Sequence, residues 1–305
     1  MLIPVGARSI AMGGASTADV KGAEAMFWNP AGLAYSPRAE VVFNNMQYIA
    51  DIDLNYLAIT YNGKSIGSFG FDIKNLSFGE IEETTEEFQD GTGNTYSPTF
   101  VVVGFSYARL LTDRIAAGVM AKFIHEGVME TSASAFAFDL GVQYSFGKNL
   151  RLGVTMQNVG TKMQYDGRNL EEARPINGGS LIVDNGYYKG IALKSDIPSL
   201  FSFGLNYTVN VNEENNFMIN GAFSNFNDAS DQIFGGVEYG FKNLFFLRGG
   251  YNYEVQAGSD QIFGASFGAG LSYPVGGFNF ALDYAWRQLT DYFDSNHIFT
   301  IKLAF

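Results

Sequence analysis

The chain of 305 residues contains no cysteine, only two histidines and few charged side chains. Without cysteine it can form no disulfide, thiol nucleophile or thiolate-bound metal site. His125 and His297 are too few for a histidine metal cluster, and we expect no metal and no cofactor. The formal net charge of −12 argues against nucleic acid as a partner, because binding nucleic acid depends on neutralising its phosphates.

Long apolar runs are also absent, and none approaches the about 20 residues of a membrane-spanning helix. No signal peptide is visible at Met1, so an exported protein of this kind would be expected to have lost its leader. Charged residues make up 16% of the chain and aromatic residues 15%, and the mean hydropathy is close to zero. This composition is typical of a transmembrane β-barrel, whose strands are apolar on one face and polar or small on the other.

From about Glu40 to Phe305 the sequence alternates with period two. In the stretch 136–146, every second residue is Phe, Leu, Val or Tyr, and most of the residues between them are small or polar. Successive side chains on a strand point to opposite faces, so each predicted strand has one apolar face. A soluble β-sandwich also alternates, but it would leave glycines such as Gly70, Gly141 and Gly204 without a purpose on the polar faces. Small residues there are explained if a segment packs against the inner wall of a barrel.

The connections between the predicted strands differ in length by parity. Those after even-numbered strands are short, whereas residues 77–97 and 160–198 form long loops after odd-numbered strands. This asymmetry is typical of outer-membrane barrels, with the long loops outside the cell and the termini in the periplasm. The predicted strands are 40–49, 54–62, 66–76, 98–109, 114–126, 133–146, 150–159, 199–209, 216–224, 232–241, 244–253, 262–273, 277–287 and 296–305.

We therefore predict an all-β fold: a transmembrane antiparallel β-barrel of about fourteen strands over residues 40–305, placed in the bacterial outer membrane. Residues 1–39 are glycine-rich and apolar, and their backbone groups need an enclosing partner. We predict that they form a plug, or hatch, inside the lumen; a mobile arm is the alternative, but such arms are poorer in apolar residues. The candidate plug residues are Arg8, Met12, Gly13, Gly14, Trp28, Asn29, Pro30, Ala31 and Gly32.

Charged residues fall in the middle of the predicted strands, on their polar faces. No serine or histidine stands with them in a recognisable catalytic arrangement, so we expect ion pairs across the lumen and no enzyme. The glycine spacing of residues 6–32 fits no nucleotide-binding motif, and the acidic loop 80–90 lacks calcium-binding spacing. The predicted lumen network comprises Asp72, Lys122, Asp139, Glu238, Arg248, Asp283, Arg287 and Lys302.

The last predicted strand places Phe299, Ile301, Leu303 and Phe305 on one face, and the chain shown stops on an aromatic residue. This looks like the terminal strand that the outer-membrane assembly machinery recognises. An ordinary edge strand that happens to end in Phe is the alternative.

Four segments resemble the PorV/PorQ family of outer-membrane proteins, relatives of the FadL fatty-acid channels. The Trp-Asn-Pro-Ala-Gly-Leu of residues 28–33 looks like the hatch of the FadL type. The other segments are 6–15, 122–126 followed by 137–141, and 152–160. The resemblance covers the first half of the chain, and the second half matches only as barrel strands. It implies a fourteen-stranded barrel with an N-terminal hatch.

The resemblance also implies type IX protein secretion, in which PorV collects cargo through C-terminal signal domains and associates with the SprA translocon. We expect the loop 160–198 to pack over the barrel mouth and bind such partners, because exposed apolar patches mark interaction sites. Its candidate residues are Met163, Tyr165, Ile176, Leu181, Ile182, Tyr187 and Tyr188.

Two other functions stay open. A FadL-like channel for hydrophobic small molecules would need an apolar pocket at the hatch and a gap in the wall. A structural barrel in a larger envelope complex would need neither.

Overall fold

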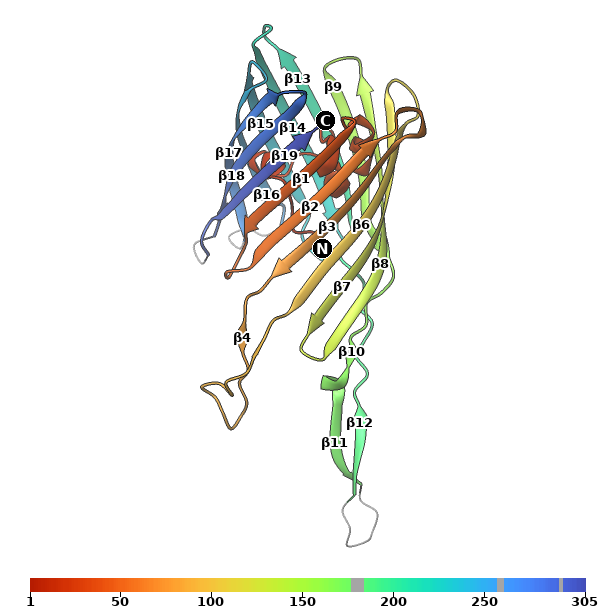
Figure 1. Ribbon diagram of the computed structural model, residues 1–305, viewed down its shortest axis with the longest axis vertical. Coiled ribbons are helices and arrows are strands. Elements are labelled where there is room, and N and C mark those ends of the chain that lie inside the picture. The colour runs from red at the N-terminus through yellow and green to blue at the C-terminus, as the bar shows by residue number, and fades with distance from the viewer. Residues whose placement is uncertain (177–183, 257–260, 291–292) are drawn as a thin grey trace.

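The computed structural model describes residues 1–176, 184–256, 261–290 and 293–305. Within these ranges, fourteen long antiparallel strands form one sheet that closes on itself through the pairing of β8 with β9 (Figure 1). The predicted barrel is therefore confirmed, and the predicted strand ends agree with the observed ones within two residues. The strands are β1 (Ala39–Gln47), β2 (Asp53–Asn62), β3 (Ser68–Ser77), β6 (Thr99–Leu110), β7 (Ile115–Val128), β8 (Thr131–Phe146), β9 (Leu150–Gly160), β13 (Leu200–Asn210), β14 (Asn215–Phe226), β15 (Gln232–Phe241), β16 (Phe245–Glu254), β17 (Phe263–Val275), β18 (Phe278–Leu289) and β19 (Asn296–Ala304).

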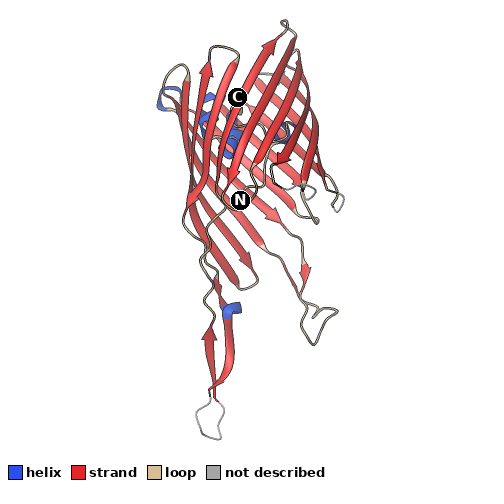
Figure 2. Ribbon diagram, turned by 180° about the vertical axis from the view of Figure 1, so that it is seen from behind, coloured by secondary structure: helices blue, strands red, loops and turns tan. Residues whose placement is uncertain are grey.

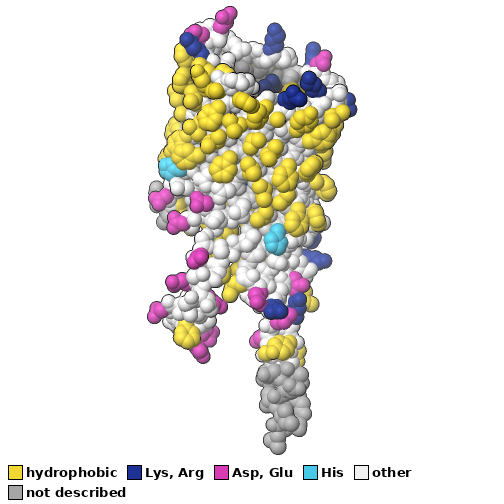
Figure 3. Space-filling model, viewed as in Figure 1, with side chains coloured by type: hydrophobic (Ala, Val, Ile, Leu, Met, Phe, Trp, Pro, Cys, Tyr) yellow, Lys and Arg dark blue, Asp and Glu magenta, His cyan; other side chains and the backbone are white. Residues whose placement is uncertain are grey.

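Each strand separates an apolar outer face from a lumenal face of small and polar residues. On β8, Phe136 and Phe138 are 60% and 57% exposed, whereas Ala135 and Ala137 between and beside them are buried. The space-filling view shows the outer apolar side chains gathered in a band around the barrel (Figure 3). The side chains on the lumenal face contact other parts of the protein, so the outer band is the surface that contacts membrane lipid.

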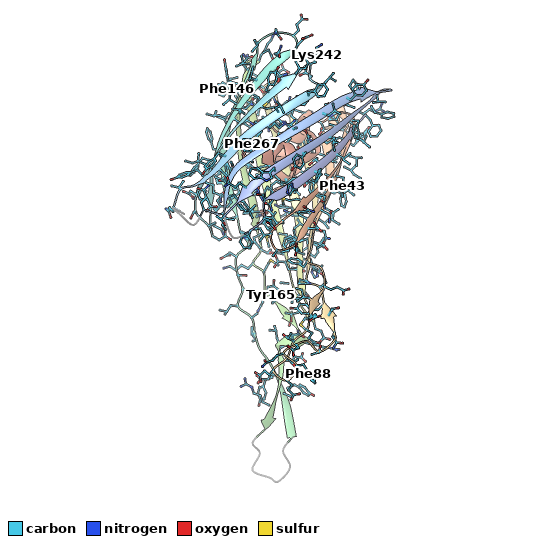
Figure 4. The ribbon with its side chains drawn as sticks, turned by 90° about the vertical axis from the view of Figure 1, so that its left-hand side faces the viewer. Phe43, Phe88, Phe146, Tyr165, Lys242 and Phe267 are labelled. Atoms are coloured by element: carbon cyan, nitrogen blue, oxygen red, sulfur yellow. The ribbon has the colours of Figure 1, made fainter. Side chains whose placement is uncertain are left out.

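The two rims of the barrel differ. Connections such as 147–149 and 242–244 are tight turns, and they all lie at one rim. The first strand, β1, begins at this rim and the last strand, β19, ends there, since the two pair antiparallel with Glu40 opposite Ala304. Figure 4 shows Phe146 and Lys242 near this rim. Tyr165 and Phe88 lie on the opposite side, on the long connections that extend away from the barrel (Figure 4).

The long loops have structure of their own. Residues 78–98 contain β4 (Ile81–Glu82) and β5 (Thr95–Tyr96). Residues 161–199 contain β10 (Asp166–Gly167), η4 (Arg168–Leu170), and a hairpin of β11 (Glu171–Ile176) and β12 (Asp184–Lys189). The hairpin projects away from the barrel along its long axis (Figure 1). The expectation that this loop packs over the mouth is therefore wrong, because its backbone pairs with itself.

The N-terminal segment lies inside the barrel, nearer the rim of tight turns (Figure 2). It consists of short helices joined by turns: α1 (Ala7–Ala11), η1 (Gly22–Glu24), α2 (Ala25–Trp28) and η2 (Pro30–Tyr35). A further single turn, η3 (Lys64–Ile66), joins β2 to β3. No helix among the described residues is long and apolar enough to cross a membrane.

Candidate functional site: the lumen and the long-loop rim

The plug begins with a helix tied directly to the barrel wall. Gly6 precedes α1 with φ +87°, a conformation that side-chain-bearing residues rarely adopt. The Ala7 N–H donates a hydrogen bond of 2.8 Å to Thr300 Oγ1 on β19. After the helix, the Gly13 N–H donates to Ser266 Oγ on β17 at 3.1 Å. The segment is thus held at both ends of its first helix by strands more than 250 residues away in the sequence.

Wall glycines lie where the plug backbone approaches most closely. A Cβ added to Gly118 would overlap the backbone of Pro30, and one added to Gly250 would overlap the backbone of Met12 and Gly13. Gly13 and Gly14 themselves have φ of +69° and +91°, which lets the chain reverse against β15 and β16. The interpretation of the polar-face glycines as plug contacts is supported at other wall positions too, namely Gly70, Gly141, Gly153, Gly204, Gly236 and Gly268. It is wrong for three further polar-face glycines, which face side chains of the wall itself: Gly104, Gly264 and Gly270.

Asn29 makes hydrogen bonds both within the plug and to the barrel wall. Its Oδ1 accepts a hydrogen bond of 3.1 Å from the Ala31 N–H and so caps η2, whose first residue is Pro30. Its Nδ2 donates to the Thr17 carbonyl at 2.8 Å and to the Val142 carbonyl at 3.2 Å. Ala31 is fully buried, and Gly32 packs against the Val20 carbonyl. The Asn-Pro-Ala-Gly run thus acts as a latch.

A chain of ion pairs crosses from the plug into the wall. Arg8 of the plug pairs with Asp19 at 2.7 Å and with Glu238 of β15 at 2.9 Å. Glu238 also accepts from Arg248 of β16 at 2.6 Å. The side chains of Glu238 and Arg248 are nearly inaccessible to solvent, at 5% and 3% exposure. Because charged groups buried in this way need partners, Arg8 is matched to this one place on the wall.

The chain continues around the wall and returns to the plug. Arg248 pairs with Asp283 at 2.5 Å, and Asp283 pairs with Lys302 at 3.3 Å. Lys302 in turn reaches Glu24 of the plug at 3.0 Å. Glu238, Arg248, Asp283 and Lys302 from the predicted network therefore lie together. The sequence interpretation missed Asp19 and Glu24, although a charged residue inside an apolar segment is itself a sign that a partner faces it.

The other predicted lumen charges lie elsewhere. Lys122 and Asp139 form a second buried pair at 2.7 Å. Asp72 is buried near them but makes no ion pair among the described residues. Arg287 on β18 also makes none within the part of the chain that the structure describes, and its Nε and Nη2 donate to Asn296 Oδ1 at 3.1 and 2.6 Å. The eight residues thus do not form one network.

The wall is irregular beside the second pair. The register between β8 and β9 shifts at Asp139, whose Oδ1 accepts from the Asn158 N–H at 2.7 Å. Asn158 has φ +58° and donates through Nδ2 to the Pro198 carbonyl at 2.7 Å, at the end of the long loop. Its neighbour Gln157 donates to the Trp28 carbonyl of the plug at 3.2 Å. The bulge therefore connects the plug to the base of the longest loop.

A cavity of about 350 Å³ lies between the plug and the long-loop rim. Trp28 lines the cavity from the side of the plug, and its Nε1 donates a hydrogen bond of 2.9 Å to the Val5 carbonyl. Tyr48, Pro198 and Asp228 line it from the side of the long-loop rim. The apolar lining comes mainly from Leu2, Ile3, Phe27, Phe226, Phe234 and Phe263. The apolar pocket that a channel would need is therefore present at the plug.

The loop residues predicted to bind partners fall into two groups. Met163 is 4% exposed and exchanges two backbone hydrogen bonds of 2.9 Å with Ser195, so it holds the loop base and is not available to a partner. Tyr165 donates to Glu126 Oε2 on β7 at 2.8 Å, and its partial burial together with this hydrogen bond raises its pKa to about 12. Tyr187 and Tyr188 on β12 are exposed, at 80% and 53%.

The remaining loop residues can be placed only in part. Ile176 is the last residue of β11, and Leu181 and Ile182 lie outside the described residues. Two apolar residues that follow β12, Ile191 and Leu193, are exposed at 86% and 92%.

The last strand presents the expected apolar face outward. Phe299, Ile301, Leu303 and Phe305 are between 40% and 50% exposed on the lipid side of β19. Their role in barrel assembly stays a prediction.

A family model described as type IX secretion system protein PorV matches residues 1–200. The chain belongs to the PorV family. The match spans the plug, the barrel strands from β1 to β9 and the long loop that follows, and it includes the latch and the bulge between β8 and β9. No curated protein matches the chain.

Solved structures show the same fold as this PorV-family barrel. The toluene transporter TbuX of Ralstonia pickettii has a TM-score of 0.61 at 15% identity, with 100% of this chain and 99% of that chain covered. The toluene transporter TodX of P. putida gives 0.59 at 14%, with 99% and 98% covered. A Pseudomonas aeruginosa FadL homologue gives 0.55 at 10%, with 99% and 98% covered. At these identities the likeness shows a FadL-like outer-membrane barrel fold and nothing about substrate.

Proposed function

We propose that this PorV-family barrel works in type IX secretion by binding protein partners through its long-loop rim. The partners are the translocon or the C-terminal signal domains of secreted cargo. The observation that carries the proposal is the hairpin of β11 and β12, which holds exposed aromatic side chains away from the membrane band (Figures 1 and 3).

The composition of this hairpin and its flank suits protein recognition. Tyr187 and Tyr188 offer large, rigid contact area at low entropic cost, and aromatic residues are enriched at interfaces. Ile191 and Leu193 extend the apolar surface toward the barrel. The exposed ion pair between Arg174 and Glu172, at 2.7 Å, adds charge at the rim of this surface. Apolar side chains this exposed are expected to be covered by a partner.

The test is to replace residues 168–190 by a short Gly-Ser linker in cells that carry a type IX cargo. We expect the barrel to assemble with normal heat-modifiable gel mobility, partners to be lost from mild-detergent purifications and cargo to stay in the periplasm. The matched control shortens residues 79–97, the other long loop, in the same way. Normal co-purification and secretion with the first variant would contradict the proposal.

This function requires the long loops to lie outside the cell and the tight turns to lie in the periplasm. Because the chain has no cysteine, single cysteines report position cleanly. An impermeant maleimide added to intact cells should label Thr92→Cys and should reach Lys148→Cys only after the outer membrane is opened. Labelling of Lys148→Cys in intact cells would reverse the orientation.

A channel for hydrophobic small molecules is the second candidate, and the apolar cavity beside the plug favours it. The described strands form a continuous ladder around the lumen, so the only irregularities to serve as a side opening are register shifts in the described β8–β9 and β17–β18 pairings. If shortening residues 168–190 leaves secretion intact but uptake of a hydrophobic solute depends on the cavity, the channel replaces the secretion role.

A further inference from the structure

The two rims of the barrel differ in charge. Figure 3 shows basic side chains along the tight-turn rim and mostly acidic ones on the long connections at the other end. The long loop 78–98 contains several acidic residues and no basic one. The tight-turn rim instead carries a set of basic residues, which we call the basic arc: Arg38, Lys64, Arg109, Arg114, Lys148 and Arg151.

The basic arc occupies one side of this rim. Its residues lie in or beside the turns β2–β3, β6–β7 and β8–β9 and the approach to β1, and these strands follow one another around the closed sheet. On the other side of the rim, the turn between β17 and β18 has no charged residue, and Lys242 after β15 pairs with Glu214 after β13 at 3.3 Å. The positive charge is therefore gathered at one place and not spread around the barrel.

The charges of the basic arc are not neutralised within the described parts of the chain. None of its side chains lies within ion-pair distance of a described carboxylate. Of the acidic residues nearby in sequence, Asp113 is exposed, and Glu40 accepts a hydrogen bond of 2.6 Å from the Ala23 N–H of the plug. The segments outside the described ranges join strand ends on the long-loop side. Like charges gathered in this way repel one another, and a facing anionic surface removes that repulsion.

Hydrogen bonds hold the turns of the arc in a fixed array. Tyr107 Oη donates a hydrogen bond of 3.0 Å to the Ile66 carbonyl, which ties the turn β2–β3 to β6. The Ser145 N–H donates one of 2.8 Å to the Arg114 carbonyl, which ties the turn β6–β7 to β8. Ile66 and Leu111 lie in these turns beside the cations and are 61% and 64% exposed. Apolar side chains with charge around them, on a fixed scaffold, have the anatomy of a protein interface.

We propose that the basic arc docks an acidic surface of a second protein, which packs over Ile66 and Leu111. A protein that docks at one place needs charge on one side of the rim only, whereas lipid headgroups surround the barrel and would attract cations placed anywhere on it. In the orientation proposed above this partner lies in the periplasm, and the proposal rests on the proposed function for that compartment alone. The surface is separate from the hairpin of β11 and β12.

The first test uses a fluorescein-labelled peptide of twelve glutamates as the acidic probe. Its fluorescence anisotropy is followed with purified protein in a non-ionic detergent at about 50 mM salt, where exposed charges are less screened than at physiological ionic strength. The arc variant is Lys64→Gln/Arg114→Gln/Lys148→Gln. The matched control, Lys162→Gln/Lys194→Gln/Lys242→Gln, removes the same charge from exposed positions outside the arc.

We expect the arc variant to bind the probe about tenfold more weakly than the parent, because each exposed charge contributes modestly. The control should bind within about twofold of the parent, and the charge-conserving Lys64→Arg/Arg114→Lys/Lys148→Arg should bind as the parent does. Equal losses in the arc variant and the control would overturn the proposal, since net charge alone would then explain binding. So would unchanged binding by an arc variant that shows heat-modifiable mobility. If the arc variant does not fold, Lys148→Gln replaces it, and the proposal fails unless its loss exceeds that of Lys242→Gln.

The second test distinguishes a protein from lipid in cells that make the chain. The photo-crosslinking residue p-benzoylphenylalanine replaces Leu111 in the arc or Val211 in the turn between β13 and β14. The two positions are matched, because Val211 is 62% exposed and its N–H donates to the Asn215 carbonyl as the Leu111 N–H donates to the Ile115 carbonyl. We expect a discrete protein adduct from position 111, joined through an acidic segment of the partner, and none from position 211.

The adduct should be lost when the arc charges are removed and should persist when residues 168–190 are replaced. The absence of a protein adduct at position 111, or light-dependent labelling of lipid alone, would overturn the proposal. So would adducts of equal yield at the two positions, or an adduct joined through a segment without acidic residues. Because the hairpin replacement is scored by secretion and the arc by this adduct, the proposed function and the docking surface fail separately.

Discussion

The plug and the long-loop hairpin are both excursions from the barrel sheet, and they are held in opposite ways. The plug reaches the wall through side-chain hydrogen bonds and ion pairs to strands across the whole sequence, among them Ala7 to Thr300 and Arg8 to Glu238. The hairpin touches the rest of the protein at its base, where Tyr165 bonds to Glu126 and β10 pairs with β8. Beyond the base its backbone pairs only with itself in the described residues.

This difference separates two tasks. A segment whose buried charges pair with the wall, as Arg8 does with Glu238 and Glu24 with Lys302, can keep the lumen closed, because displacing it would leave these charges unpaired. A segment whose backbone hydrogen bonds are made within itself, and whose apolar side chains are exposed, can bind a partner without disturbing the barrel. Asn158 is the point at which the two meet, since it contacts the base of the loop and lies beside the residue that bonds to Trp28.

Removing the plug should have the largest effect. Deletion of residues 1–38 is expected to leave a barrel that inserts into planar bilayers and conducts ions, because the lumenal face it uncovers is polar. The parent should be nearly silent in the same measurement. Deletion of residues 168–190 is the control and should leave the barrel closed. Equal conductance in parent and plug deletion would mean that residues 1–38 do not seal the lumen.

The buried ion pairs should matter more than the exposed ones. Arg248→Met removes the shared partner of Glu238 and Asp283 and is expected to destabilise the barrel by about 3 kcal/mol. Lys242→Met breaks the exposed pair with Glu214 at 3.3 Å and should cost about 0–1 kcal/mol. Urea unfolding in lipid vesicles, followed by gel mobility, measures both. A loss for Lys242→Met as large as that for Arg248→Met would contradict the ranking.

Much of the barrel could be predicted because each strand signals itself locally. The alternation in residues 136–146 depends only on which face of β8 meets lipid, and the turn at 147–149 depends only on its own residues. The plug was also predictable in outline, since an apolar, glycine-rich segment needs an enclosure and Gly70 or Gly141 needs a reason to lie in a strand.

The rest of the site depends on contacts that no local pattern encodes. Nothing near Glu24 in the sequence indicates that it meets Lys302, and nothing near Asp139 predicts that Asn158 takes a left-handed conformation to cap it. The charges on β3, β7, β15, β16 and β18 look alike in sequence. Only the sheet order decides that Arg248 joins the ion-pair chain while Arg287 faces the cavity.

A smaller change to the plug's fit should loosen it without removing a charge. Gly118→Val places a side chain where the Pro30 backbone lies, so we expect a loss of about 1–3 kcal/mol from overpacking. Gly147→Ala is the control at a turn, where an added Cβ meets nothing within 4 Å and only the positive φ of +67° is strained. Hydrogen exchange by mass spectrometry should show faster exchange of residues 25–35 in Gly118→Val alone. Unchanged exchange there would mean that the plug tolerates a gap from the wall.

The smallest effect is expected at the base of the hairpin. Tyr165→Phe removes the hydrogen bond to Glu126 and should cost about 0.5–1.5 kcal/mol of local stability, which hydrogen exchange should detect as faster exchange of residues 161–167.

Because the pKa of Tyr165 is raised to about 12 from an ordinary value of about 10, the contact is fully present below pH about 10 and is lost only as the pH rises through about 12. The difference between parent and variant, corrected for intrinsic exchange, should therefore be the same at pH 7 and pH 9. Tyr187→Phe, whose side chain is 80% exposed, should behave as the parent in this segment. If Tyr165→Phe exchanges no faster than Tyr187→Phe, the hairpin is held by its backbone pairing with β8 and not by this side chain.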